Sequence, residues 1–132
     1  MRASDLMIGD WLLSVIDRYD HVEKKPCRVT GIRIDGSELI QADDTDVWYS
    51  PCTYEPIPIT PEFLEKNFEK KVLFGIFDDY FDMEIHEIND GLFQATYHSC
   101  EMSVPDQSMT LCYVHELQHF LTHCAIEKEV VL

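Results

Sequence analysis

The chain has 132 residues, of which 45% are hydrophobic and 11% aromatic, so it carries enough apolar surface to fold as one domain or as two small lobes that share a core. Its 25 acidic and 10 basic residues give a formal net charge of −15, which disfavours contact with nucleic-acid phosphates and with anionic membranes. The same charge suits plain solubility, a basic partner protein, or a protein that imitates the charge of nucleic acid.

The cysteines and the first residues favour a reduced, cytoplasmic protein. Secreted disulfide scaffolds usually have an even and denser set of cysteines, whereas this chain has 5 and no C-x-x-C pair. We expect free thiols, mostly buried as small hydrophobic side chains, at Cys27, Cys52, Cys100, Cys112 and Cys124. Asp5 and Asp10 interrupt any signal-peptide core, and the apolar runs are far shorter than the roughly 20 residues of a membrane helix. We therefore expect no targeting segment and no membrane contact.

Residues 1–59 are predicted to form a small SH3-like β-barrel lobe. Gly31 lies inside a β-prone run, where a glycine often marks a bulge, and Asp35-Gly36 is typical of a hairpin turn. Five short strands with tight turns favour a barrel, and other small β folds fit the same pattern. These strands are expected at 11–16, 27–34, 37–42, 46–50 and 54–59.

A short linker helix is predicted next, over 60–68. Thr60 is a good N-cap, Pro61 suits the first helical position, and Glu62 lies at the positive end of the helix dipole. The helix opens a second part of the chain, placed at 60–132, which is either a separate lobe or continuous with the first in one domain.

This second part is predicted to be an antiparallel β-sheet packed by one C-terminal helix, which makes the fold class α+β. Strand alternation over 80–88 places Phe81, Met83 and Ile85 on one face, and a hairpin turn is expected at 89–91. Further strands are expected at 71–77, 92–100, 101–104 and 128–132, and the best helix of the chain at 110–125.

The late helix contains the string H-E-x-x-H, the zinc-hydrolase signature, as His115, Glu116 and His119. In such enzymes the two histidines bind zinc from one helix face, and the glutamate acts as general base on the metal-bound water. A catalytic zinc also needs a third protein ligand, and the extended pattern asks for glycine and histidine where this chain has Thr122 and Ala125. We therefore predict no catalytic residue and no metal ligand here, with a zinc-dependent hydrolase as an alternative.

Helical periodicity predicts which face of this helix is buried. At about 100° per residue, one apolar stripe is formed by Val114, Leu117, Leu121, Cys124 and Ala125. The histidines recur every fourth residue and are expected on the opposite, solvent-exposed side, at His115, His119 and His123. A surface histidine stripe of this kind can catch a transition metal adventitiously.

A second candidate metal set combines His98 and Cys100, two residues apart on a predicted strand, with Cys112 and His115, three apart on a predicted helix. Two sulfur and two nitrogen ligands are a structural-zinc set in principle, but we expect Cys112 in the core and His98 exposed. The acidic run at 43–46 lacks the glycine and terminal glutamate of an EF-hand loop, so a solvated turn is expected there. No phosphate-binding loop, dinucleotide-binding glycine pattern or nucleophile elbow occurs, and no cofactor is predicted.

Three stretches, "ASDLMIGDW" (3–11), "EPIPITPEFL" (55–64) and "YVHELQHF" (113–120), carry a resemblance to a known family. In order and spacing they resemble short uncharacterised proteins encoded by gut Bacteroidetes and their phages or mobile elements. Met7 replaces the arginine usual in that family, and Glu116 and His119 stand where it often has glutamine and asparagine. The resemblance implies that H-E-x-x-H is here a local variation on a helix that needs no metal, and it carries over no activity, cofactor or binding site.

These patterns together predict a non-catalytic, cytoplasmic accessory or protein-interaction protein, and the resemblance implies an origin in a phage or mobile element. An acidic inhibitor that mimics nucleic acid and occupies a DNA-binding protein is the second hypothesis, and the zinc-dependent hydrolase is the third. Neither the partner nor the oligomeric state follows from the residues.

Overall fold

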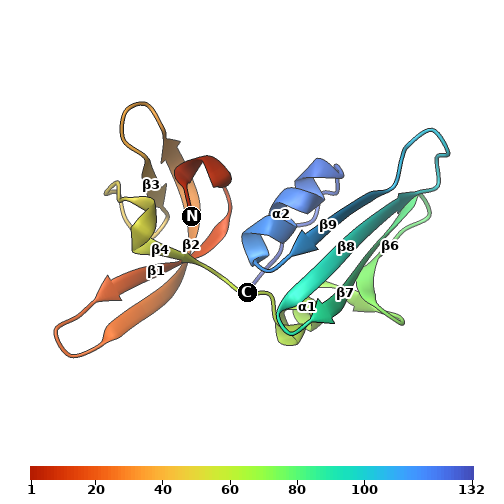
Figure 1. The fold of residues 1–132 in the computed structure, drawn as a ribbon, viewed down its shortest axis with the longest axis horizontal. Helices are drawn as coiled ribbons and strands as arrows, with labels where there is room; N and C mark the ends of the chain where they lie inside the picture. The colour runs from red at the N-terminus through yellow and green to blue at the C-terminus, as the bar shows by residue number, and fades with distance from the viewer. The chain divides into compact units, whose positions relative to one another are not determined.

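The computed structural model describes residues 1–132 and divides them into two compact units, Met1–Ile57 and Pro58–Leu132 (Figure 1). Each unit holds one antiparallel sheet, and the second also holds both α-helices, so the predicted α+β class is confirmed. The sequence placed the boundary two residues later. Pro58 forms a β-bridge with Tyr113, and the amide of Ile59 donates to the carbonyl of Cys112 at 2.9 Å, which ties both residues to the second unit.

The first unit is a four-stranded sheet with the order β3-β2-β1-β4. No closed barrel is formed by these strands. The strand expected at 46–50 is replaced by a single bridge between Tyr49 and Ile40. The elements are η1 (Ala3–Asp5), β1 (Trp11–Asp17), β2 (Val22–Arg33), β3 (Leu39–Ala42), η2 (Pro51–Thr53) and β4 (Tyr54–Pro56).

The long strand β2 serves two partners because it changes register at a glycine. Its first half pairs with β1, its second half pairs with β3, and the register shifts between Val29 and Gly31, so the predicted bulge is confirmed. A Cβ atom at Gly31 would lie 2.6 Å from Cη2 of Trp48, so the indole ring packs where only glycine leaves room. The core beneath this sheet consists of Ala3, Leu6, Leu12, Cys27, Val29, Ile40, Ala42 and Tyr54.

Two ionisable groups are part of this apolar core. Burial, together with the nearby carboxylates of Asp44 and Asp43, raises the pKa of the Cys27 thiol from its ordinary value of 9.0 to about 12. Burial raises the pKa of the Tyr54 phenol from 10.0 to about 12, and the nearby carboxylate of Asp44 contributes to the same rise. The Cys27 thiol donates to the carbonyl of Leu12 at 3.6 Å, which requires its protonated form. The core therefore holds both groups neutral.

The second unit is a five-stranded sheet with the order β5-β6-β7-β8-β9. Its first helix begins as predicted, because the hydroxyl oxygen of Thr60 accepts from the amide of Phe63 at 3.1 Å. The predicted face of the central strand is confirmed, since Met83 and Ile85 are buried. The elements are α1 (Pro61–Asn67), β5 (Glu69–Lys70), β6 (Phe74–Phe77), β7 (Phe81–Asn89), β8 (Leu92–Ser99), β9 (Gln107–Leu111) and α2 (Val114–His123).

Two predicted strands are wrong, and the late helix is confirmed but begins later than predicted. Residues 101–104 form a turn instead of a strand, and residues 128–132 form no strand. The late helix begins at Val114 and not near Thr110, because β9 pairs with β8 over Tyr97↔Gln107 to Phe93↔Leu111. Pairing with the edge of β8 outweighs the local helical pattern of residues 110–111.

The segment that follows α2 is held by a buried side-chain amide instead of a strand ladder. The helix ends at His123, Ala125 follows with a φ of 57°, and the amide of Ile126 closes the last turn on the carbonyl of Leu121 at 2.8 Å. Further on, Nδ2 of Asn67 donates to the carbonyl of Val131, and the amide of Val131 donates to Oδ1 of Asn67, each at 2.7 Å. Nδ2 of Asn67 also donates to the carbonyl of Phe63 at 2.9 Å, within α1. One side chain thus fixes the end of the chain against the first helix.

We expect Asn67→Ala to lower the free energy of unfolding by about 1–3 kcal/mol, because buried backbone groups lose their partners. Glu65→Ala, on the exposed face of the same helix, should change it by less than about 0.5 kcal/mol. Urea unfolding measures both variants, and hydrogen exchange of the Val131 amide reports the local effect. A fully protected Val131 amide in Asn67→Ala would show that something else holds the segment.

The two neutral groups of the first core make stability depend on alkaline pH. A raised pKa in the folded state contributes stability that is complete below the unfolded value and is lost as the pH rises toward the folded value. We therefore expect the free energy of unfolding to fall between about pH 9 and pH 12, measured by urea titrations across that range. The fall should be shallower in Cys27→Ala and unchanged in Cys52→Ala, whose thiol is exposed. An identical fall in all three proteins would exclude Cys27 as a source.

Candidate functional site

The glutamate of the H-E-x-x-H string caps its own helix. Oε1 of Glu116 accepts the amide of Cys112 at 2.9 Å and the amide of Tyr113 at 3.0 Å. These amides precede the first helical residue, Val114. The N–H groups at the start of a helix have no acceptor within the helix, so a side chain must supply one. The carboxylate is therefore oriented toward the backbone at the start of the helix, while a zinc hydrolase needs it on a metal-bound water.

The histidines of this helix do not form the exposed stripe that was predicted. His115 is buried, with 7% of its surface exposed, and His119 is half-buried. The ring of His115 stacks on Tyr113 with centroids 6.0 Å apart and meets the ring of His119 edge-on at 5.6 Å. Helical periodicity could not predict the burial of His115, because it identifies only the apolar face of the helix. It gives no information on contacts that other side chains make with the first turn. The buried residues of α2 are Val114, His115, Leu117, Phe120 and Leu121.

The proposed four-residue zinc set is not assembled. No group of three or more histidine, cysteine, aspartate or glutamate side chains is arranged to hold a metal ion. Nδ1 of His98 instead lies 2.9 Å from Oδ2 of Asp106, and Cys100 is exposed, whereas Cys112 is half-buried. The acidic run at 43–46 begins with a turn in which the amide of Thr45 donates to the carbonyl of Ala42 at 3.2 Å, and Oδ1 of Asp43 accepts from the amide of Arg28 at 2.9 Å. All five cysteines are free.

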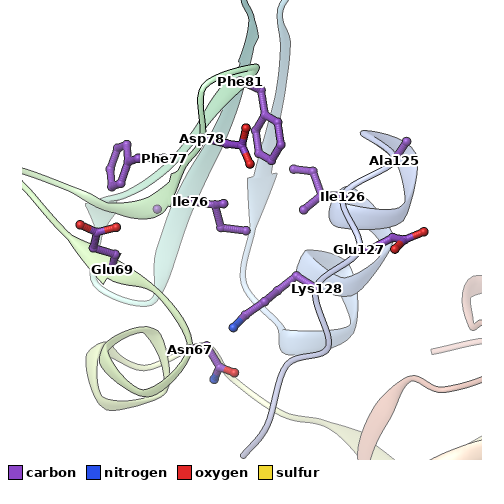
Figure 2. Close-up of a pocket in the computed structure, with 11 residues that line it drawn as sticks. Asn67, Glu69, Ile76, Phe77, Asp78, Phe81, Ala125, Ile126, Glu127 and Lys128 are labelled. Carbon is purple, nitrogen blue, oxygen red and sulfur yellow. The ribbon is translucent and has the colours of Figure 1, made fainter.

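A groove that the sequence did not indicate runs through the second unit, between the sheet and the segment after α2 (Figure 2). Its volume is about 580 Å³. Figure 2 shows Ile76, Asp78 and Phe81 on the sheet side and Ile126 and Lys128 on the other side. The segment at 125–128 was expected to lead into an edge strand. The sequence therefore did not predict that this segment lines one side of a groove. Lining residues are Asn67, Glu69, Gly75, Ile76, Phe77, Asp78, Phe81, Ala125, Ile126, Glu127 and Lys128.

The groove combines an apolar interior with an acidic rim. Three large apolar side chains, of Ile76, Phe81 and Ile126, face the groove and are half-buried, whereas the ring of Phe77 lies on the other side of β6 (Figure 2). Three exposed carboxylates, of Glu69, Asp78 and Glu127, stand among the lining residues against the single cation of Lys128. An apolar cleft with a few charged groups at its edge is typical of a binding site. Its lining carries no pair of groups arranged as nucleophile and base.

We expect Glu116→Ala to lower the free energy of unfolding by about 1–2 kcal/mol, because two amides at the start of α2 lose their acceptor. Glu116→Gln keeps an acceptor oxygen and loses only the charge, so it should cost less than half as much. Thermal and urea unfolding of the two variants beside the parent provide the measurement. Equal stability of the parent and Glu116→Ala would remove the structural role assigned to this carboxylate.

None of the helices is long and apolar enough to span a membrane.

Comparison with known proteins does not place the chain in a family. No family model matches it, and neither a curated protein nor a solved structure gives a significant match.

Proposed function

We propose that this chain is a non-catalytic accessory protein of the cytoplasm that acts by binding another protein. The observation that carries the proposal is the placement of Glu116, the one residue of H-E-x-x-H that would perform the chemistry, on the backbone amides of Cys112 and Tyr113. A residue engaged in this way contributes to the fold, and the histidines beside it contribute to ring packing. The function then depends on the surface of the protein. The groove of the second unit combines apolar side chains with carboxylates, as a site that binds another protein would.

The charge of the chain supports a basic protein as the partner. A net charge of −15 accelerates encounters with positively charged surfaces and slows encounters with anionic ones. Nucleic acid and anionic membrane are therefore not proposed as direct partners.

Two finer interpretations belong to this proposal. The first unit is proposed to be SH3-like in its strand arrangement, which is supported by the long β2 shared between β1 and β3 around the bulge at Gly31. Membership of the family of short Bacteroidetes and phage proteins is proposed from the three matching stretches at 3–11, 55–64 and 113–120. Both are compatible with a binding scaffold, and neither specifies a partner, because a fold does not imply a function.

The test is affinity capture with the parent chain and with Glu116→Gln, from a lysate of the cells that express it, combined with elemental analysis of the dialysed protein. We expect both forms to retain the same basic protein, to release it as salt is raised, and to contain far less than one zinc per chain. One tightly bound zinc whose loss follows His115→Asn or His119→Asn would favour the hydrolase. A captured DNA-binding protein that free DNA displaces would favour the acidic decoy.

A further inference from the structure

The outer edge of β6 is open where the groove begins. Its neighbour β5 pairs with it only over Glu69↔Gly75 and Lys70↔Phe74, because the chain before Glu69 is the helix α1. The amide of Asp78 donates to the carbonyl of Phe81 at 3.0 Å, toward β7. Residues of an antiparallel strand alternate in the direction of their backbone groups, so the amide and carbonyl of Phe77 face away from β7, toward the open edge. A backbone donor and acceptor are thus available beside the groove.

The apolar interior lies within reach of a chain that pairs with this edge. Figure 2 shows the side chains of Ile76 and Phe81 directed toward Ile126 across the groove. All three are half-buried, so a bulky apolar side chain inserted between them would remove further apolar surface from water. An extended segment places every second side chain on the same face, and one such side chain can occupy the groove while the backbone pairs with Phe77.

The charges around the groove select a cationic occupant. None of the carboxylates of Glu69, Asp78 and Glu127 forms an ion pair with a side chain of this protein. The one cation, Lys128, lies 6.0 Å from the ring centroid of Phe68, and Figure 2 shows its amino group directed toward Asn67. Asp78 accepts only the amide of Tyr80, at 3.0 Å, and Nζ of Lys71 lies 4.4 Å from the ring centroid of Phe77, so the lining residues keep an excess of negative charge without an ion pair. A second copy of a chain with net charge −15 would be repelled here, whereas lysine and arginine side chains would be attracted.

We propose that this groove binds an extended segment of a basic protein, in which a bulky apolar residue is flanked by lysine or arginine. The apolar residue lies between Ile76, Phe81 and Ile126, the backbone pairs with the outer edge of β6 at Phe77, and the flanking cations lie beside Glu69 and Asp78. This site rests on the proposed function, since it names the surface and the partner chemistry through which an accessory protein of this kind acts.

The test uses a fluorescein-labelled peptide, Lys-Lys-Val-Leu-Val-Lys-Lys, and fluorescence anisotropy with the full chain. We expect saturable binding with a dissociation constant below about 1 mM at low salt, weakened as salt is raised. Replacing every lysine of the peptide by glutamate, or its three apolar residues by serine, should abolish binding. No binding of the basic peptide, or equal binding of the serine version, overturns the proposal.

Paired variants locate the site. Glu69→Gln with Asp78→Asn should weaken binding roughly five- to tenfold, since two exposed charge pairs are lost, and Glu101→Gln in the loop after β8 should weaken it less than about twofold. Ile126→Ala should weaken it roughly fivefold, and the fully exposed Met102→Ala should leave it unchanged. Urea unfolding confirms that each variant is folded. Equal losses in the groove variants and their controls would mean that the peptide responds only to overall charge.

Hydrogen exchange distinguishes backbone pairing from simple apolar docking. We expect the amide of Phe77 to gain protection when the peptide binds, while the amides of β9, at the other edge of the same sheet, do not change. Protection at β9 instead of Phe77 would place the peptide on the wrong edge and overturn the site. Affinity capture separates this inference from the proposed function, because a natural partner retained by the groove variants would leave the function standing and remove the groove from it.

Discussion

The pairing of Asn67 with Val131 is the interaction on which the architecture of the second unit depends. The chain after α2 forms no strand, so its backbone groups need partners from elsewhere. The amide of Asn67 offers a donor and an acceptor side by side, as a neighbouring strand would, and Val130 is buried next to this pair. Lys66 adds a hydrogen bond to the carbonyl of Leu132. Because these contacts hold the segment in place, Ile126 and Lys128 can form the second wall of a groove.

The H-E-x-x-H string shows how residues of the same type can serve different chemistry. A zinc hydrolase needs two histidines aimed at one metal and a glutamate aimed at its water. Here Glu116 completes the start of α2, and His115 is packed between the rings of Tyr113 and His119. Every member of the motif thus has a structural role in this helix. Outside the motif, apolar side chains and carboxylates without ion pairs occur together around the groove.

Sequence reasoning performed well where a few neighbouring residues decide the structure. The cap at Thr60 follows from its hydroxyl and from the proline after it, and the bulge at Gly31 follows from a glycine inside a β-prone run. The alternation of Met83 and Ile85 was enough to predict the buried face of β7. The absence of a metal site in H-E-x-x-H stays a prediction, and the expected exposure of His115 was wrong, because this side chain is buried. In each correct case the evidence lay within about four residues of the feature.

The groove was beyond such reasoning because its parts meet only in the folded chain. Asn67 and Val131 are 64 positions apart, and neither carries a local sign of the other. Residues 107–111 form a strand because they pair with the edge of β8. His115 is buried, although it lies outside the apolar stripe of α2, and its ring contacts Tyr113 and His119. The residues alone determined the α+β class, the local turns and caps, and the acidic charge, since each of these depends on composition or on neighbours in sequence. Only the tertiary structure decided where residues 125–132 lie, which edge of the sheet is open, and which carboxylates form no ion pair, because those properties depend on contacts between segments that are distant in sequence.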